Sequence, residues 1–206
     1  MPTALFPAFL KLQGRRVVVV GGGPVAASKL SSLQAAGADV TVVAPEICDA
    51  IRTAGVAIRQ KPFAPSDLDD AWFVVAAAPP DVNRRVADEA EQRQVFVNAV
   101  DDPANASVYL GGVVRRDGVT LAISTDGAAP ALAGLLREAL DFMLPDDLGT
   151  WNTRARELRA SWRARGVPME ARRPELLEAL NALYDARRSD DHASGAAESS
   201  QPELVK

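Results

Sequence analysis

The feature that most constrains the fold is a run of four valines followed directly by three glycines. The valines occupy residues 17–20 and the glycines residues 21–23. An unbroken apolar run of this kind is typical of a strand buried on both faces of a parallel sheet. Gly21, Gly23 and Ala26 fit the pattern G-x-G-x-x-G/A, in which a tight turn lets phosphate groups approach the backbone. The stretch therefore predicts a strand, a phosphate-binding turn and a helix.

The chain after this turn favours a dinucleotide site. Apolar residues recur at helical spacing up to Ala36, and Gly37 is placed to end that helix. Residues 39–43 predict a second strand, and Glu46 follows it at about the spacing of an acid that binds ribose. A glycine turn that serves packing alone is the alternative, because glycine turns occur in many folds.

The next part of the chain continues to alternate strands with helices. The expected strands are residues 56–58, 71–77 and 95–100, and the expected helices are residues 47–54 and 82–90. This alternation predicts an α/β fold with a Rossmann-type doubly wound parallel sheet. Ligands bind at the carboxyl ends of the strands in such sheets, and Asp101 follows the last of these strands. We therefore expect Asp101 on the cofactor side of the sheet.

Beyond Asp102 the pattern changes to a hairpin followed by helices. Asp117 and Gly118 lie between two strand-like runs, which is a strong hairpin signal. Pro130 is suited to the first turn of a helix whose leucine-rich face we expect in the core or in a subunit interface. Two more helices are predicted around residues 148–165 and 173–188.

The composition excludes several kinds of site and partner. A net charge of −4 gives no electrostatic reason to expect nucleic acid. One cysteine, Cys48, and one histidine, His192, exclude an intramolecular disulfide, a cysteine-based zinc site and a histidine-rich metal cluster. No apolar run approaches the length of a membrane span, and the N-terminus lacks the pattern of a signal peptide. We therefore expect a cytoplasmic, soluble protein with no metal site and no binding to nucleic acid or membrane.

Several blocks along the chain match one protein family in order. They are residues 6–10, 14–15, 19–29, 36–45, 82–83, 97–103, 122–130 and 136–138. The glycine pattern is shared by many folds, whereas Asn98 with Asp101-Asp102, and Ser124-Thr125 with Pro130, are more specific. With these blocks the sequence resembles the precorrin-2 dehydrogenase module of siroheme synthases, which occurs alone or fused to a methyltransferase.

This resemblance implies an enzyme of tetrapyrrole biosynthesis. The family oxidises precorrin-2 to sirohydrochlorin with NAD on the route to siroheme, and some members also insert ferrous iron as a sirohydrochlorin ferrochelatase. The resemblance implies a homodimer of subunits that have three folded parts. For this chain the predicted parts are a Rossmann domain at 1–106, a dimerisation region (hairpin plus helix) at 107–146, a C-terminal helical region at 147–188 and a disordered tail at 189–206.

The resemblance also assigns roles to individual residues. Asp101 matches the catalytic aspartate and is expected to accept a proton, whereas we expect Asp102 to cap the turn before Pro103 and Asn98 to orient the loop. The cofactor contacts of the family match Gly21, Gly22, Gly23, Pro24, Val25, Pro45 and Glu46. Neither arginine nor lysine directly follows the second strand, which favours NAD over NADP. Where the family usually has Ser-Phe-Ile-x-Pro, residues 107–111 read Ser-Val-Tyr-Leu-Gly, so we expect a different fit around the tetrapyrrole.

Two other functions are compatible with part of the sequence. A non-catalytic Rossmann module that senses NAD and regulates a partner would explain the glycine turn and Glu46. It would not require Asp101 or the block at residues 124–130. A dehydrogenase for another small metabolite would explain the cofactor residues, and it predicts no binding of a tetrapyrrole.

Overall fold

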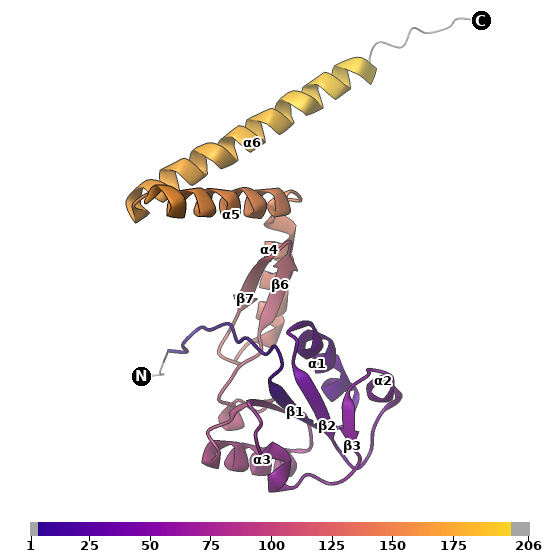
Figure 1. Cartoon of the computed structure of the whole chain (residues 1–206). Helices are drawn as coiled ribbons and strands as arrows, with labels where there is room; N and C mark the ends of the chain where they lie inside the picture. Colours follow the sequence, from indigo (N-terminus) through magenta and orange to yellow (C-terminus); the bar gives the residue numbers. More distant parts are fainter. Residues whose placement is uncertain (1–3, 199–206) are drawn as a thin grey trace, which may run out of the picture. The chain divides into compact units, whose positions relative to one another are not determined.

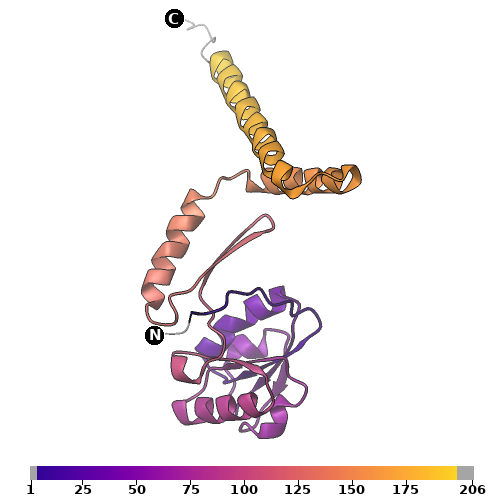
Figure 2. The same ribbon diagram turned by 90° about the vertical axis from the view of Figure 1, so that its left-hand side faces the viewer.

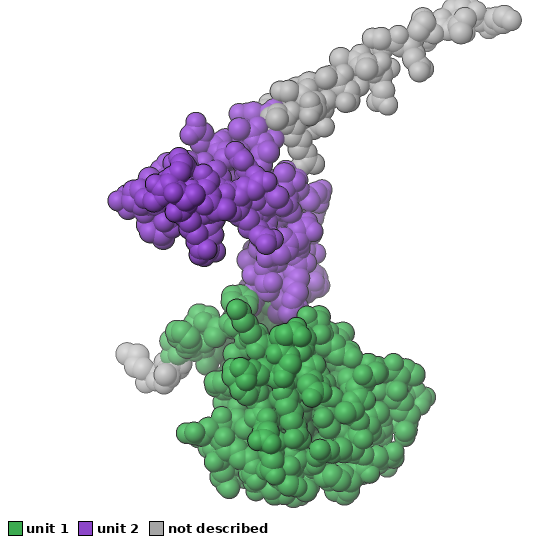
Figure 3. All heavy atoms as spheres, viewed as in Figure 1, with its two compact units in different colours: residues 1–112, 123–135 green, residues 113–122, 136–206 purple. Residues whose placement is uncertain are grey.

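The computed structural model describes residues 4–198, and the chain divides into two compact units. The first unit contains residues 1–112 and 123–135, and the second contains residues 113–122 and 136–206 (Figure 3). The division falls within a hairpin and within a helix, so both units share these elements. No described helix has both the length and the apolar character that crossing a membrane requires.

The first unit is built on a five-stranded parallel sheet (Figure 1). Its strands, in chain order, are β1 (Arg16–Val20), β2 (Asp39–Val43), β3 (Ala57–Arg59), β4 (Phe73–Ala76) and β5 (Phe96–Ala99). They lie in the order β3-β2-β1-β4-β5, and every neighbouring pair is parallel. The chain therefore reverses its direction of winding between β1 and β4, which confirms the predicted doubly wound fold.

Three predicted helices connect these strands, and two short 3₁₀ helices, which were not predicted, also occur in this unit. They are α1 (Pro24–Ala35), α2 (Asp49–Arg52), α3 (Pro80–Gln92) and the 3₁₀ helices η1 (Pro65–Leu68) and η2 (Pro103–Asn105). The β1 valines alternate between two core clusters because successive side chains of a strand point to opposite faces. Val17 and Val19 share a cluster with residues of α1, and Val18 and Val20 share one with residues of α3. All four are at most 2% exposed, so the core holds the glycine turn at a fixed place at the end of β1.

The hairpin has the predicted turn. It joins β6 (Gly112–Arg116) to β7 (Val119–Ile123), which form a two-stranded sheet. Asp117 and Gly118 have φ angles of +47° and +82°, the left-handed pair that a type I′ turn requires. The helices that follow are α4 (Pro130–Met143), α5 (Leu148–Arg165) and α6 (Met169–Glu198).

The predicted start of the tail needs correction. Figure 2 shows α6 as one uninterrupted helix, and it extends to Glu198 instead of ending at residue 188. Residues 189–198 lack apolar periodicity, but they contain several alanines, which have the highest helix propensity. Propensity of this kind continues a helix that has already been nucleated. The rest of the predicted tail, residues 199–206, lies outside the described residues.

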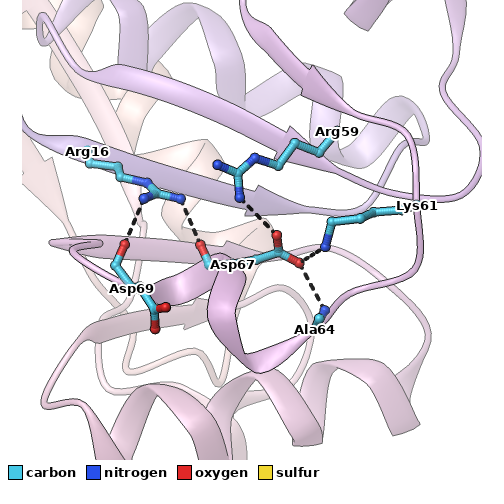
Figure 4. A network of polar contacts seen from close by, with 6 residues as sticks. All are labelled: Arg16, Arg59, Lys61, Ala64, Asp67 and Asp69. Atoms are coloured by element: carbon cyan, nitrogen blue, oxygen red, sulfur yellow. Dashed lines mark hydrogen bonds and ion pairs between the residues drawn. The ribbon is translucent and has the colours of Figure 1, made fainter.

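A buried carboxylate joins η1 to the end of β3 (Figure 4). Asp67 is 1% exposed, and its carboxylate accepts hydrogen bonds from Arg59 Nη1 at 3.1 Å, Lys61 Nζ at 2.5 Å and the Ala64 N–H at 2.9 Å. Burial raises the pKa of Asp67, but the three hydrogen bonds outweigh burial and hold the pKa below its ordinary value of 3.8.

Asp67→Asn is expected to lower the free energy of unfolding at neutral pH by about 1.5–3 kcal/mol, the usual range for hydrogen bonds to a charged group. The folded pKa of Asp67 is depressed, so its contribution is complete above the unfolded pKa and disappears as the pH falls through the folded pKa. Urea unfolding between pH 7 and pH 2 would measure this. The free energy of unfolding of the wild type should fall to that of the variant only below about pH 4.

Asp69→Asn is the matched control for this prediction. Asp69 pairs with Arg93 at 3.5 Å, and its side chain is 60% exposed, so its loss should cost less than about 1 kcal/mol. Equal destabilisation by the two variants would show that the buried cluster contributes no more than a surface pair.

Candidate functional site

A cavity of about 610 Å³ opens at the carboxyl ends of β1, β2 and β4. Its walls are the glycine turn, the loop after β2, the segment after β3 and the first turns of α3. Five of the predicted cofactor residues line it together: Gly21, Gly22, Gly23, Pro45 and Glu46. The sheet thus brings the glycine turn and the predicted ribose acid to one cavity, although they are far apart in sequence.

The first two glycines are required by close backbone contacts. A Cβ atom on Gly22 would lie 1.7 Å from the carbonyl oxygen of Glu46, and one on Gly21 would lie 2.2 Å from that of Ala77. Gly21 also has a φ of +134°, a conformation that side chains rarely adopt. The Gly22 carbonyl accepts a hydrogen bond from the Cys48 N–H at 2.8 Å. The loops after β1, β2 and β4 therefore meet around residues without side chains.

The start of α1 is suited to an anion. Gly23 is its N-cap, no side chain caps the helix, and the first turn contains no acidic residue. The N–H groups of a first helical turn have no partner within the helix, and they carry the positive end of its dipole. A pyrophosphate placed against this turn would supply the missing acceptors.

The remaining two predicted cofactor residues do not line the cavity. Pro24 and Val25 form the first turn of α1, and Val25 is 48% exposed. Pro24 has no N–H to offer to a phosphate, and its role in the helix start is to fix the φ angle of the first position. Their contacts with a cofactor stay a prediction.

Asp101 lies beyond β5 and is not part of the cavity lining. Its side chain is exposed, and its φ of +56° places it in the left-handed region. Non-glycine residues in this region are uncommon and cluster at functional sites. The cavity therefore brings five of the predicted cofactor residues together but does not include the predicted catalytic carboxylate.

Neighbouring side chains fix the backbone on either side of Asp101. Asn98 is buried, and its Nδ2 donates to the Val108 carbonyl at 2.9 Å, in agreement with the expected role in orienting the loop. Asp102 precedes η2, but its carboxylate accepts from Asn105 Nδ2 at 2.7 Å instead of from a backbone N–H. Its predicted capping role is therefore corrected to a side-chain contact that supports the same turn.

Two other parts of the cavity were missed by sequence reasoning. Pro62 and Phe63 form a wall on the segment after β3, and Arg85 contributes a cation from α3. Arg85 lies three residues after Val82, which also lines the cavity, so helical spacing could have indicated it. Nothing in the local sequence pattern marks Pro62 and Phe63, because their place depends on where β3 joins the sheet.

Cys48 offers a direct test of the cavity. It is half-buried, it lines the cavity, and it is the single cysteine of the chain. NAD bound there should slow alkylation of Cys48 by iodoacetamide, up to about 100-fold at an NAD concentration of about 100 Kd, because only the free protein then reacts. Mass spectrometry of the alkylated chain would follow the rate.

Alkylation in urea, where the cavity is lost, serves as the control and should not respond to NAD. Calorimetry would show separately that NAD is bound under the same conditions. If NAD is bound but alkylation of the folded protein is not slowed, the cofactor binds elsewhere.

Comparisons with known proteins show which family the chain belongs to. Residues 8–112 match a protein family described as "Putative NAD(P)-binding". A siroheme synthase of Photorhabdus laumondii is 39% identical over 183 residues, covering 86% of this chain and 39% of that protein. Siroheme synthase 3 of Aeromonas hydrophila is 38% identical over 195 residues, covering 91% of this chain and 42% of that protein. The chain spans about two fifths of the length of these curated relatives.

A solved structure resembles the chain over most of its length. The protein described as "SirC, precorrin-2 dehydrogenase" aligns with a TM-score of 0.66 and 26% sequence identity, covering 84% of this chain and 88% of that one. These comparisons confirm the predicted fold class and the resemblance to precorrin-2 dehydrogenases and siroheme synthases, and they support NAD as the cofactor. The chain belongs to this family of NAD(P)-binding proteins, because the family match at residues 8–112 covers about half of the length of the chain.

Proposed function

We propose that this chain is an NAD-dependent precorrin-2 dehydrogenase that forms sirohydrochlorin for siroheme biosynthesis. The observation that carries the proposal is the structural match to a precorrin-2 dehydrogenase along 84% of the chain. That match extends well beyond the NAD(P)-binding region at residues 8–112. A shared dinucleotide fold alone would not produce similarity over the hairpin and the later helices.

The cavity supplies the groups that hold the cofactor. The N–H groups at Gly22, Gly23 and the start of α1 would bind the pyrophosphate, and Glu46 would accept a hydrogen bond from a ribose hydroxyl. Pro62 and Phe63 would offer apolar surface to the adenosine half. When bound, NAD accepts the hydride that is removed from the substrate.

Asp101 accepts the proton that accompanies the hydride. No hydrogen bond or ion pair to its carboxylate is found among the described residues, so the carboxylate is available to a substrate. Loss of this proton together with the hydride would remove two hydrogens from the substrate and leave one new double bond in the macrocycle. Asn98 and Asp102 hold the turn that presents this carboxylate.

The chain acts as a homodimer through the apolar face of α4. The exposed fraction is 49% for Leu132, 65% for Leu135 and 93% for Phe142. An apolar surface of this extent on one helix is typical of an interaction site. The sequence predicted a stripe of Leu132, Leu135, Leu136, Leu140 and Met143 as core or interface, and Phe142 lies next to it on the helix. The exposure of Leu132 and Leu135 within the chain favours the interface.

The double variant Leu135→Glu/Phe142→Glu is expected to convert a dimer into a monomer, since each charge would have to be buried without a partner. Light scattering after size-exclusion chromatography would measure the mass, and retained NAD binding would show that the first unit is still folded. A wild-type chain that is already a monomer at the same concentration would contradict the proposed dimer.

An assay with precorrin-2 and NAD, carried out without oxygen, tests the proposed reaction. The visible spectrum should change to that of sirohydrochlorin only when enzyme and NAD are both present. If the chain were an NAD-sensing regulatory module, it would bind NAD, but the spectrum of precorrin-2 would change no faster than in the enzyme-free control. Addition of ferrous iron to sirohydrochlorin without NAD tests iron insertion separately.

A further inference from the structure

Two cations lie next to the end of the cavity where the adenosine ribose is expected. Arg59 is the register partner of Val43, which lines the cavity, and Lys61 directly precedes Pro62 in the cavity wall. Between them, Gln60 donates from Nε2 to the carbonyl of Pro45 at 3.2 Å, beside Glu46. Neither arginine nor lysine directly follows β2, whereas these two cations come from the end of β3 and the segment after it, and neither lines the cavity itself.

Both cations are turned toward one buried carboxylate (Figure 4). Asp67 accepts from Arg59 at 3.1 Å and from Lys61 at 2.5 Å, and its side chain is 1% exposed, whereas theirs are 46% and 42% exposed. Arg16 holds the carboxylate in place by donating to the backbone carbonyls of Asp67 at 3.1 Å and Asp69 at 2.8 Å. One carboxylate therefore binds the charged groups of both neighbours of Gln60.

NADP differs from NAD by a phosphate on the 2′-oxygen of the adenosine ribose. Sites that accept NADP place an arginine near this position, and sites that prefer NAD place an acid there. A free guanidinium or ammonium group at the end of β3 would be a suitable partner for such a phosphate.

We propose that Asp67 is a specificity-determining residue of the cofactor cavity, which selects NAD by withholding Arg59 and Lys61 from a 2′-phosphate. This inference rests on the proposed NAD site. Glu46 acts in the same direction, since its carboxylate repels a phosphate at the ribose. Arg85 also lines the cavity, but it lies on α3 after β4, and β4 flanks β1 on the side opposite to β2 and β3.

Asp67→Asn tests the proposal because it removes the negative charge at nearly constant size. Calorimetry with NAD and with NADP should show that the ratio of the NADP Kd to the NAD Kd falls about tenfold or more, as expected for one new charged contact. A purely structural role of Asp67 would weaken both dinucleotides together and leave this ratio unchanged. An unchanged ratio would overturn the proposal.

Two further variants complete the test of Asp67. Replacing both cations in the variant, as Asp67→Asn/Arg59→Met/Lys61→Met, should restore the wild-type ratio. Glu89→Gln is the matched control, because it also removes a carboxylate that pairs with an arginine, Arg93. Neither Glu89 nor Arg93 lines the cavity, so this variant should leave the ratio of the two Kd values unchanged. If the triple variant kept the low ratio, Arg59 and Lys61 would not be the groups that meet the phosphate.

Gln60→Arg keeps the proposal testable if Asp67→Asn does not fold. Residue 60 is exposed and reaches the Pro45 carbonyl, so an arginine there would be a cation that Asp67 does not bind. This variant should also favour NADP, and an unchanged ratio would show that the segment lies away from the 2′-position.

If the wild type bound neither dinucleotide, the proposed function would fail. If it bound NAD but the ratio never moved, only the role of Asp67 would fail.

Discussion

Asp101→Asn should lower kcat for precorrin-2 oxidation by about 10²–10⁴-fold, the usual contribution of a positioned general base. The amide cannot take up the proton that leaves with the hydride. The KM for NAD should stay unchanged, because Asp101 does not line the cofactor cavity. Steady-state kinetics with each substrate varied in turn would separate the two effects.

The choice of asparagine follows from the backbone at this position. Asp101 has a φ of +56°, and asparagine tolerates the left-handed region better than most residues, so the turn should survive the substitution. Asp102→Asn is the neighbouring control. The Asp102 carboxylate contacts Asn105, and its replacement should reduce the rate far less. Full activity of Asp101→Asn would show that another group accepts the proton.

Gly22→Ala is expected to have the second large effect, on the cofactor cavity itself. Its new Cβ would lie 1.7 Å from the Glu46 carbonyl oxygen, a backbone atom that can move only with the loop after β2. We expect a loss of stability of about 1–3 kcal/mol, as for other overpacked sites. The displacement of Glu46 should weaken NAD binding by about 10- to 100-fold.

Gly134→Ala provides the control for this substitution. Gly134 lies in α4 with nothing within 4 Å of an added Cβ, so the change should stabilise the helix by about 0.5–1 kcal/mol and leave NAD binding unchanged. Calorimetry with NAD and urea unfolding of both variants would measure the effects. Wild-type NAD affinity in Gly22→Ala would mean that the contact between the glycine turn and Glu46 does not shape the site.

Those parts of the molecule that depend on local patterns were predictable from the sequence. The valines of β1 specified a strand buried on both faces, the glycines after it specified the turn, and Asp117-Gly118 specified the hairpin. In each case a single backbone requirement is met by residues that are adjacent in the chain. Local chemistry was enough there.

The features that sequence reasoning missed depend on contacts between distant segments. The burial of Asp67 requires η1 to pack against the end of β3, and no periodic pattern in the sequence predicts that contact. The wall formed by Pro62 and Phe63 arises in the same way. The helix α6 continues beyond its last apolar turn because the residues that follow have helix propensity without apolar periodicity.

The proposed dehydrogenase is tested by measuring NADH and sirohydrochlorin together in one reaction with precorrin-2, NAD and the purified chain. The hydride lost by the substrate must appear on the cofactor, so the two products should form at the same rate and in equal amounts. Asp101→Asn should slow both equally. Sirohydrochlorin formed without NADH, or NAD bound tightly with neither product formed, would contradict the proposed dehydrogenase.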